Sequence, residues 1–362
     1  MNKITARKQI KKLLLLDSAG SFMIAGASWV ALLYARGFST IEIGFAESIF
    51  HVASLMFEIP SGAVADVFGR KKVMVASRIM SVIAAVIMIF SNGFAGVAIA
   101  MLFSALSYNL ASGTREALAY DSLKAADIED EYEKFASNDL IIYQITSSAA
   151  TLLAGVALML GYRRAYALDV IIALESILIT LSLKEVESGV SKEMGVWKRF
   201  IEVAQESFLF LKNNRRTRLI IVFNATTGAV SMLILFFLQA KLPSYGLPKV
   251  WLGPALFGMG LGAALGPKVI QFFPNYRYRA IAGINLAGVA FTIGMLLTGK
   301  WYLILIGGFV ASFSDSFLEV RTDVVLNNMI PSEQRATLMS IKSFTYSLVM
   351  ILLSPVFGWL FS

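Results

Sequence analysis

The sequence lacks cysteine and is poor in charge, and both absences narrow its chemistry. Because none of the 362 residues is Cys, neither a disulfide nor a cysteine-based metal site is expected, and no other metal site is predicted. Charged residues make up 15% of the chain, against about 25% in an ordinary soluble domain. The sequence also lacks Walker, GxGxxG and HExxH motifs and a Ser/His/Asp arrangement. We therefore expect neither an enzyme nor a cofactor.

Apolar residues are what the chain has in abundance. They make up 57% of it, and the mean hydropathy is +0.69. Stretches of about 20 apolar residues, enough to cross a ~30 Å hydrocarbon core as a helix, recur with short polar breaks. Because open sheet edges do not survive in lipid, the predicted fold class is all-α integral membrane. Eleven spans are expected, at residues 13–35, 40–65, 72–91, 95–123, 137–161, 164–183, 217–242, 249–273, 278–297, 300–328 and 334–361.

The distribution of basic residues predicts the orientation. With the N-terminus in the cytoplasm, 24 of the 32 Lys and Arg residues lie on the inner side and 6 on the outer side. By the positive-inside rule this predicts a multi-pass protein of the cytoplasmic membrane with an inner N-terminus. Basic loops facing anionic membrane lipid account for the net charge of +8. No nucleic-acid partner is expected.

One long polar segment divides the chain. Its apolar residues recur at helical spacing between residues 197 and 211, which predicts an interfacial amphipathic helix; a flexible linker is the alternative. The expected domains are residues 1–183, a six-helix bundle; residues 184–216, a cytoplasmic linker; and residues 217–362, a bundle with five visible helices. The stretches "SGTREALAYDSL" and "LEVRTDVVLNNM" form a weak repeat between the bundles. Such paired bundles are typical of secondary transporters with a central substrate path.

The turn between the second and third expected spans carries a recognisable motif. "EIPSGAVADVFGRKKVM" resembles the signature of the major facilitator superfamily, and with the paired halves and basic inner face the resemblance covers the whole chain. It implies two pseudo-symmetric six-helix bundles, of which the twelfth helix is missing or not included. It also implies a cytoplasmic latch whose residues are Gly62, Asp66, Gly69, Arg70 and Lys71.

The chemistry of the motif fits a latch. Asp66 can accept backbone N–H bonds near residues 332–335, Gly69 permits a tight turn, and the cations can pair with carboxylates of the opposite half. An ordinary basic loop with a capping Asp is the alternative. Near the inner helix ends, snorkelling or salt bridges to Arg70, Arg78 or Lys342 are expected for Glu58, Asp121 and Asp323.

Ionisable residues inside the spans are the candidate coupling sites, because each costs at least ~2.5–3.5 kcal/mol at mid-helix. Arg115 resembles the arginine of a second family motif linked to proton coupling, although "GTREAL" stands where R-x-x-Q-G is usual. Neighbouring helical side chains point roughly 100° apart. We therefore expect that Glu116 and Arg115 do not simply neutralise each other on one helix face. The partner of Arg115 is expected to be Asp17, Glu47 or Glu319.

The predicted proton-coupling residues are Asp17, Glu47, Glu116 and Arg115. Static ion pairs between helices are the alternative for this set. His51 lies four residues after Glu47 on the same helix face. It is either a proton relay or a hydrogen-bonded interior residue.

Aromatic and polar side chains in the spans suggest the substrate class. Stacking and cation–π contacts suit amphipathic or cationic organic molecules. The predicted cavity residues are Phe22, Trp29, Phe50, Tyr108, Asn109, Tyr143, Gln144, Asn224, Asp315 and Glu319.

Together these features predict a secondary active transporter that works by alternating access. Proton-coupled efflux of hydrophobic or cationic small molecules is the first choice, although the fifth expected span lacks the Gly-Pro pair common in the family's antiporters. The alternatives are a proton symporter or uniporter importing one metabolite, and a non-transporting receptor or scaffold. The expected partners are a small-molecule substrate, protons and membrane lipid, and the protein is expected to be a monomer.

Overall fold

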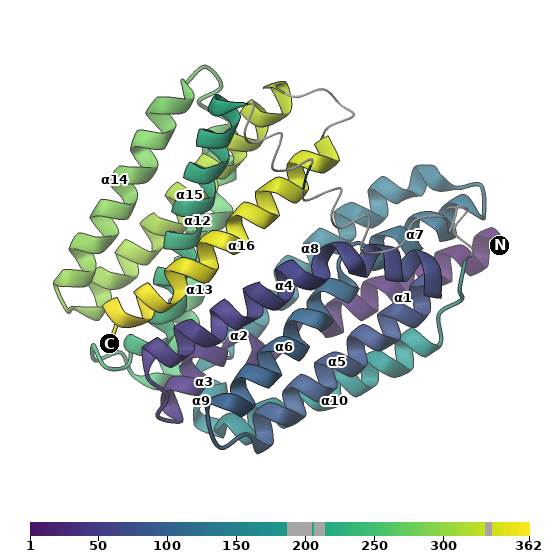
Figure 1. The fold of residues 1–362 in the computed structure, drawn as a ribbon, viewed down its shortest axis with the longest axis horizontal. Helices are drawn as coiled ribbons and strands as arrows, with labels where there is room; N and C mark the ends of the chain where they lie inside the picture. Colours follow the sequence, from purple (N-terminus) through teal and green to yellow (C-terminus); the bar gives the residue numbers. More distant parts are fainter. Residues whose placement is uncertain (187–204, 206–213, 330–334) are drawn as a thin grey trace. The chain divides into compact units, whose positions relative to one another are not determined.

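The computed structural model describes residues 1–186, 205, 214–329 and 335–362, and its elements there are helices joined by short turns (Figure 1). The side chains of residues 58–64, 66–67, 335–337 and 339–340 are not described. The predicted amphipathic helix and the proposed partner region of Asp66, residues 332–335, thus lie almost wholly outside the described residues. By their internal contacts the residues form two compact units. Unit 1 is Met1–Leu32 with Ile49–Phe200, and unit 2 is Leu33–Ser48 with Ile201–Ser362.

The helices up to residue 181 have these bounds: α1 Lys3–Ser21, α2 Ile24–Ala27, α3 Trp29–Ala35, α4 Thr40–Phe68, α5 Arg70–Phe90, α6 Phe94–Ala111, α7 Thr114–Lys124, η1 Glu129–Glu131, α8 Tyr132–Leu152, α9 Ala154–Leu160 and α10 Tyr162–Leu181. Those from residue 215 on are α12 Arg215–Lys241, η2 Lys249–Trp251, α13 Leu252–Ile270, α14 Tyr278–Leu297, α15 Trp301–Met329 and α16 Arg335–Leu360.

Eight described helices are long and apolar enough to cross a membrane, and the bent pair α8–α9 makes a ninth if it is one span. The all-α membrane fold class is therefore confirmed. The two remaining expected spans correspond to α1–α3, which is broken, and to α10. The latter carries Arg163, Arg164, Asp169 and Glu175 among its 20 residues. The exact number of spans, eleven, stays a prediction.

The first expected span is interrupted, and a carboxylate from another helix accepts hydrogen bonds from the backbone N–H groups at the interruption. Residues 13–35 were expected as one helix, but α1 ends at Ser21 and the short α2 follows. Asp169 of α10, which is 4% exposed, accepts hydrogen bonds from the backbone N–H groups of Ile24 at 2.8 Å and Gly26 at 2.9 Å. The first N–H groups of a helix have no intrahelical acceptor. Asp169 supplies one inside the protein.

Two other expected spans are also divided. Residues 95–123 form α6 and α7, and the chain turns between them at Gly113, whose φ of 72° is a left-handed conformation that glycine adopts without strain. Residues 137–161 form α8 and α9, which meet at an angle of 46°. The second break turns α9 away from the direction of α8.

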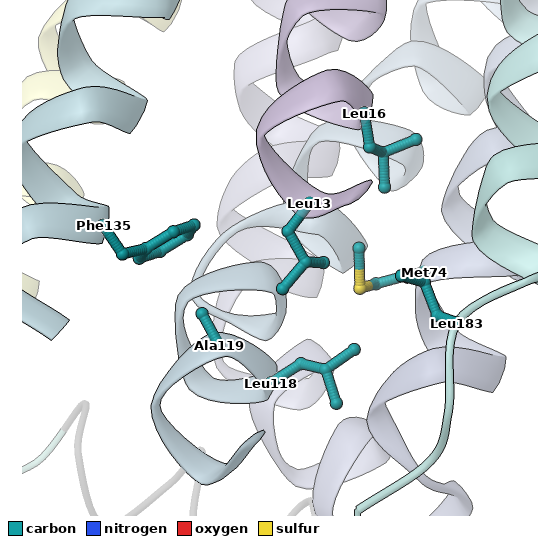
Figure 2. Packing of buried hydrophobic residues seen from close by; sticks show 7 residues of the cluster. All are labelled: Leu13, Leu16, Met74, Leu118, Ala119, Phe135 and Leu183. Atoms are coloured by element: carbon teal, nitrogen blue, oxygen red, sulfur yellow. The ribbon is translucent and has the colours of Figure 1, made fainter. Parts of the chain in front are cut away.

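The core of unit 1 joins helices that are distant in the sequence. Leu13 and Leu16 of α1 pack with Met74 of α5, Leu118 of α7 and Phe135 of α8, as Figure 2 shows. Each of these side chains is at most 3% exposed. Burial of this cluster fixes α1, α5, α7 and α8 as one body, and these same helices carry the ionic cluster described below.

Close helix packing in unit 2 depends on glycine. A Cβ atom at Gly262 of α13 would collide with the carbonyl oxygen of Phe309 on α15 and lie 2.9 Å from the backbone nitrogen of Phe313. One turn later, a Cβ at Gly266 would lie 2.6 Å from the carbonyl oxygen of Phe313. Membrane helices lack a hydrophobic force between them and associate through such small-residue contacts. The two glycines let the backbones of α13 and α15 touch.

Gly262→Val should therefore destabilise the protein by about 1–3 kcal/mol through overpacking. Gly260→Val is the matched control, because Gly260 lies on the same helix with open space at its Cβ position. Thermal unfolding in detergent measures both. Equal melting temperatures for the two variants would contradict the close α13–α15 contact.

Candidate functional site

Arg115 lies at the centre of an ionic cluster in unit 1. Its guanidinium, on the second residue of α7, donates to Asp17 of α1, to Asp139 of α8 at 2.7 Å and to Glu116 at 3.1 Å. Asp17 and Asp139 are 3% and 8% exposed. One side chain therefore connects three helices through carboxylates withdrawn from solvent.

The cluster confirms one expected pairing and corrects another. Asp17 is a partner of Arg115, as predicted. The expectation that Glu116 cannot neutralise Arg115 is wrong, because the long guanidinium side chain reaches the adjacent carboxylate despite the angle between them. The pairing of Arg115 with Asp139 was not predicted. The signal was present, because an acid inside the expected span 137–161 needs a cationic partner.

The cluster contains more acid than base. Arg78 of α5 interacts electrostatically with both Asp17 and Arg115 and lies against Gly20 of α1. Three carboxylates thus face two guanidiniums. One oxygen on each of Asp17, Glu116 and Asp139 has no hydrogen-bond partner within the described residues. A proton bound at one of these oxygens would leave the group electrically neutral.

The two remaining titratable candidates lie on α4. Glu47 is 7% exposed and His51 is 9% exposed. The His51 ring meets the ring of Phe50 edge-on, with centroids 5.5 Å apart. Glu47 belongs to the portion of α4 that is grouped with unit 2, and His51 to the portion in unit 1. The Glu47–His51 relay stays a prediction.

The motif turn after α4 is held by two carboxylates of its own unit. Gly69 precedes α5 with φ 96°, so the tight turn is present. Arg70 forms the expected salt bridge with Asp121 of α7. The second carboxylate, that of Glu185, was not predicted. It accepts a hydrogen bond from the backbone N–H of Lys71 at 3.1 Å and lies against Gly69, where a Cβ atom would be 2.7 Å from its oxygen.

A carboxylate at this position complements the positive end of the α5 dipole. The environment of Gly62 and the side chain of Asp66 fall outside the described residues. The latch between halves therefore stays a prediction.

In unit 2, two of the predicted cavity residues, Asn224 and Glu319, line a pocket of about 200 Å³. It is lined by Ile221, Asn224, Ala225, Glu319, Lys342, Ser343 and Tyr346. Asp315 lies one helical turn before Glu319, with its carboxylate 3.6 Å from the Cβ position of Gly228. Lys342 also pairs with Asp323, as predicted for the helix ends. Acidic, amide, hydroxyl and aromatic groups therefore surround one small cavity.

Arg321 is the arginine of the second repeat stretch, "LEVRTDVVLNNM", and its role differs from that of Arg115 in the first stretch. Arg321 of α15 donates to the carbonyl oxygens of Phe273 at 2.6 Å and Pro274 at 2.9 Å. It satisfies backbone groups beyond the end of α13 and thereby positions the turn into α14. The two units thus carry an arginine on the corresponding helix with different partners.

The remaining predicted cavity residues have diverse surroundings. Asn109 is 1% exposed, donates to the Ser54 carbonyl at 2.9 Å and accepts from the Ser54 hydroxyl at 3.0 Å, so its amide joins α6 to α4. Tyr108 is 62% exposed and its ring lies 6.1 Å from that of Phe50.

The last four cavity candidates lie in unit 1. Tyr143 and Gln144 are exposed on α8. Phe22 follows the end of α1, and Trp29 begins α3, so both flank the interrupted region of the first span.

Arg115→Ala should destabilise the protein by about 3–5 kcal/mol, because it leaves buried carboxylates without a counter-charge. Arg115→Ala combined with Asp17→Asn should recover part of this loss by removing one of those charges. Arg163→Ala, at an exposed arginine of α10, is the control. Thermal unfolding of purified protein checks the series, and an undiminished stability of Arg115→Ala would contradict the central role of this side chain.

Known proteins resemble this chain in sequence and in fold. The sequence model of the family described as Major Facilitator Superfamily matches residues 13–287. The chain is 25% identical over 342 residues to an uncharacterized MFS-type transporter, YxaM, of Bacillus subtilis (strain 168), covering 91% of this chain and 83% of that one.

Solved structures share the fold. The nucleoside transporter NupG superimposes with a TM-score of 0.74 at 18% identity, covering 97% of this chain and 90% of that one. A D-xylose-proton symporter gives a TM-score of 0.62 at 15% identity, covering 98% and 90%. The family match spans well over half of the sequence, and the chain therefore belongs to the Major Facilitator Superfamily of membrane transporters.

Proposed function

We propose that this transporter exports hydrophobic or cationic small molecules in exchange for protons, by alternating access of a central path between its two bundles. Membership of a transporter family, rather than of an enzyme class, is established by the sequence match. The direction of transport, the coupling ion and the substrate belong to our proposal. The observation that carries the proposal is the surplus carboxylate around Arg115.

The ionic cluster is suited to carry one proton. With all groups ionised, Asp17, Glu116 and Asp139 exceed Arg115 and Arg78 by one negative charge. An uncompensated charge is costly in a low-dielectric environment, so binding of a proton is favoured there. Protonation of Asp17 would also weaken its ionic bond to Arg115 and so the contact between α1 and α7. Proton binding and helix movement are thereby linked.

The pocket of unit 2 supports a cationic substrate. Glu319 contributes a carboxylate to its lining, and Tyr346 contributes an aromatic ring. Lys342 also lines the pocket, but its ammonium group pairs with the carboxylate of Asp323. A carboxylate beside an aromatic face is the combination that recognises organic ammonium groups through charge and cation–π attraction. Asp315 adds a second acid one turn away on α15.

A second candidate function is import of one polar metabolite together with protons. The same pocket contains the amide of Asn224 and the hydroxyl of Ser343, which suit hydrogen-bonding substrates. Two proteins of the same fold are named as a nucleoside transporter and a D-xylose-proton symporter. At 15–18% identity this likeness concerns the fold and leaves the substrate open.

Flux in proteoliposomes distinguishes the candidates. With an imposed pH gradient and labelled organic cations, inside-out vesicles should accumulate the cation if the protein is an exporter. Asp17→Asn, Glu116→Gln and Asp139→Asn remove the surplus charge, so at least one should abolish accumulation while leaving downhill exchange. Glu175→Gln, at an exposed acid of α10, is the control. Retained accumulation in all three variants would sink the proton assignment, and uptake in the opposite direction would favour import.

We also propose that the motif turn acts as the inner latch, that the N-terminus lies in the cytoplasm and that the protein is a monomer. Arg70 and Asp121 bind each other at the motif turn, so Asp121→Asn should free Arg70 and loosen the inner gate. Because the chain has no native Cys, single cysteines placed in the inner half of α7 report access to an impermeant maleimide without background. We expect faster labelling in Asp121→Asn than in a Glu133→Gln control. Equal rates would contradict the gating role.

A further inference from the structure

Two acids of α15 lie in and beside the small pocket of unit 2. Asp315 and Glu319 are four residues apart, so their side chains project from the same face of the helix. The two carboxylates interact electrostatically with each other. Within the described part of the chain neither forms an ion pair, and Lys342, a basic residue of the pocket lining, is paired with Asp323. Two negative charges therefore lack a counter-charge from the described residues.

Gly228 of α12 connects Asp315 to the pocket. A Cβ atom on Gly228 would lie 3.6 Å from a carboxylate oxygen of Asp315 and 3.8 Å from a ring carbon of Tyr346. Tyr346 also lines the pocket, together with Glu319 and with Asn224, which is one helical turn before Gly228. The ring of Tyr346 is thus shared by the two places. Because glycine has no side chain, space remains beside the Asp315 carboxylate and this ring.

The spacing of the two acids sets the separation of the charges that they would bind. Four residues along an α-helix correspond to a rise of about 6 Å. Two ammonium groups joined by an extended chain of four methylene groups are about equally far apart. The side chains of Ile221 and Ala225 give the pocket apolar surface for such a chain. Its volume of about 200 Å³ is below the ~300–1,000 Å³ of sites for drug-sized molecules, which limits the ligand to a small one.

We propose that this pocket binds a small organic dication, with one ammonium group on Glu319 and the other on Asp315 beside Gly228. The inference rests on the proposed transport of cations and names the class of cation. Each ammonium group would form charge-assisted hydrogen bonds with one carboxylate. The ring of Tyr346 would add cation–π attraction between the two acids.

Charge balance favours a dication over the other possible ligands. A single ammonium group would neutralise one acid and leave the other charged in the membrane interior, where an uncompensated charge is costly. A metal ion is not favoured, because the described residues contain no group of three His, Cys, Asp or Glu side chains that could hold one. Aromatic and apolar lining residues instead suit a carbon chain between two charges.

Calorimetric titration of the purified full chain in detergent tests the proposal at neutral pH and without a gradient. The probe is putrescine, the terminal diamine of butane, and n-butylamine is the monovalent comparison. Putrescine should bind about tenfold more tightly, because its second ammonium group adds a charge-assisted hydrogen bond. N-acetylputrescine keeps the chain and one charge but replaces the second ammonium group by an amide. It should bind like n-butylamine.

Substitutions locate the two charges. Asp315→Asn and Glu319→Gln should each abolish the preference for putrescine over n-butylamine. Gly228→Ala adds a methyl group at ordinary contact distance from its neighbours, so the melting temperature should be preserved while putrescine binding weakens. The matched controls are Glu175→Gln, at an exposed acid of α10, and Gly258→Ala, at a position of α13 with open space for a Cβ atom. Both should keep the preference.

Equal affinity of the wild-type protein for putrescine and n-butylamine would overturn the dication site and leave a single charge to be bound. An unchanged preference in Asp315→Asn would overturn it as well. The proposed function fails separately. A preference for putrescine without pH-driven accumulation in proteoliposomes would support the dication site and contradict proton-coupled export, whereas pH-driven accumulation of monoamines together with equal affinities would do the reverse.

Discussion

One buried guanidinium governs the arrangement of the first bundle. Arg115 contacts carboxylates from α1 and α8 as well as its own neighbour. In a membrane these charges cannot rely on water, so each position is acceptable only while the others are in place. The apolar cluster around Leu13 and Leu118 packs the same helices beside this network. Apolar packing holds these helices together. A change in the charge of the ionic network would alter the contacts between α1, α7 and α8.

The two units use similar positions for different purposes. In unit 1 the arginine of α7 binds acids, whereas in unit 2 Arg321 of α15 binds backbone carbonyls. In unit 2, Glu319 lines a small pocket, and Asp315 lies one helical turn before it on α15. The arginines of the two repeat stretches thus have different partners.

Residue patterns revealed the features that depend on composition and local spacing. Apolar length predicted the helical membrane fold, and the cost of intramembrane charge led to Asp17 as a partner of Arg115 and to the Arg70–Asp121 and Lys342–Asp323 pairs. The interrupted first span was not predictable, because its break depends on Asp169, some 140 residues later in the chain. The contact at Gly262 likewise depends on which helix becomes its neighbour. The sequence around Glu185 contains no pattern that predicts its contact with the start of α5.

The capping of α2 by Asp169 bears on how the chain is assembled during synthesis. The backbone amides of Ile24 and Gly26 receive their acceptor from α10. When the first hydrophobic segment leaves the ribosome, that carboxylate has not yet been translated. The nascent segment must therefore remain straight, or keep its amides in contact with water or the translocation channel, until α10 arrives. Maturation of the first helix into its interrupted form is thus a late step of biogenesis, coupled to completion of the N-terminal bundle.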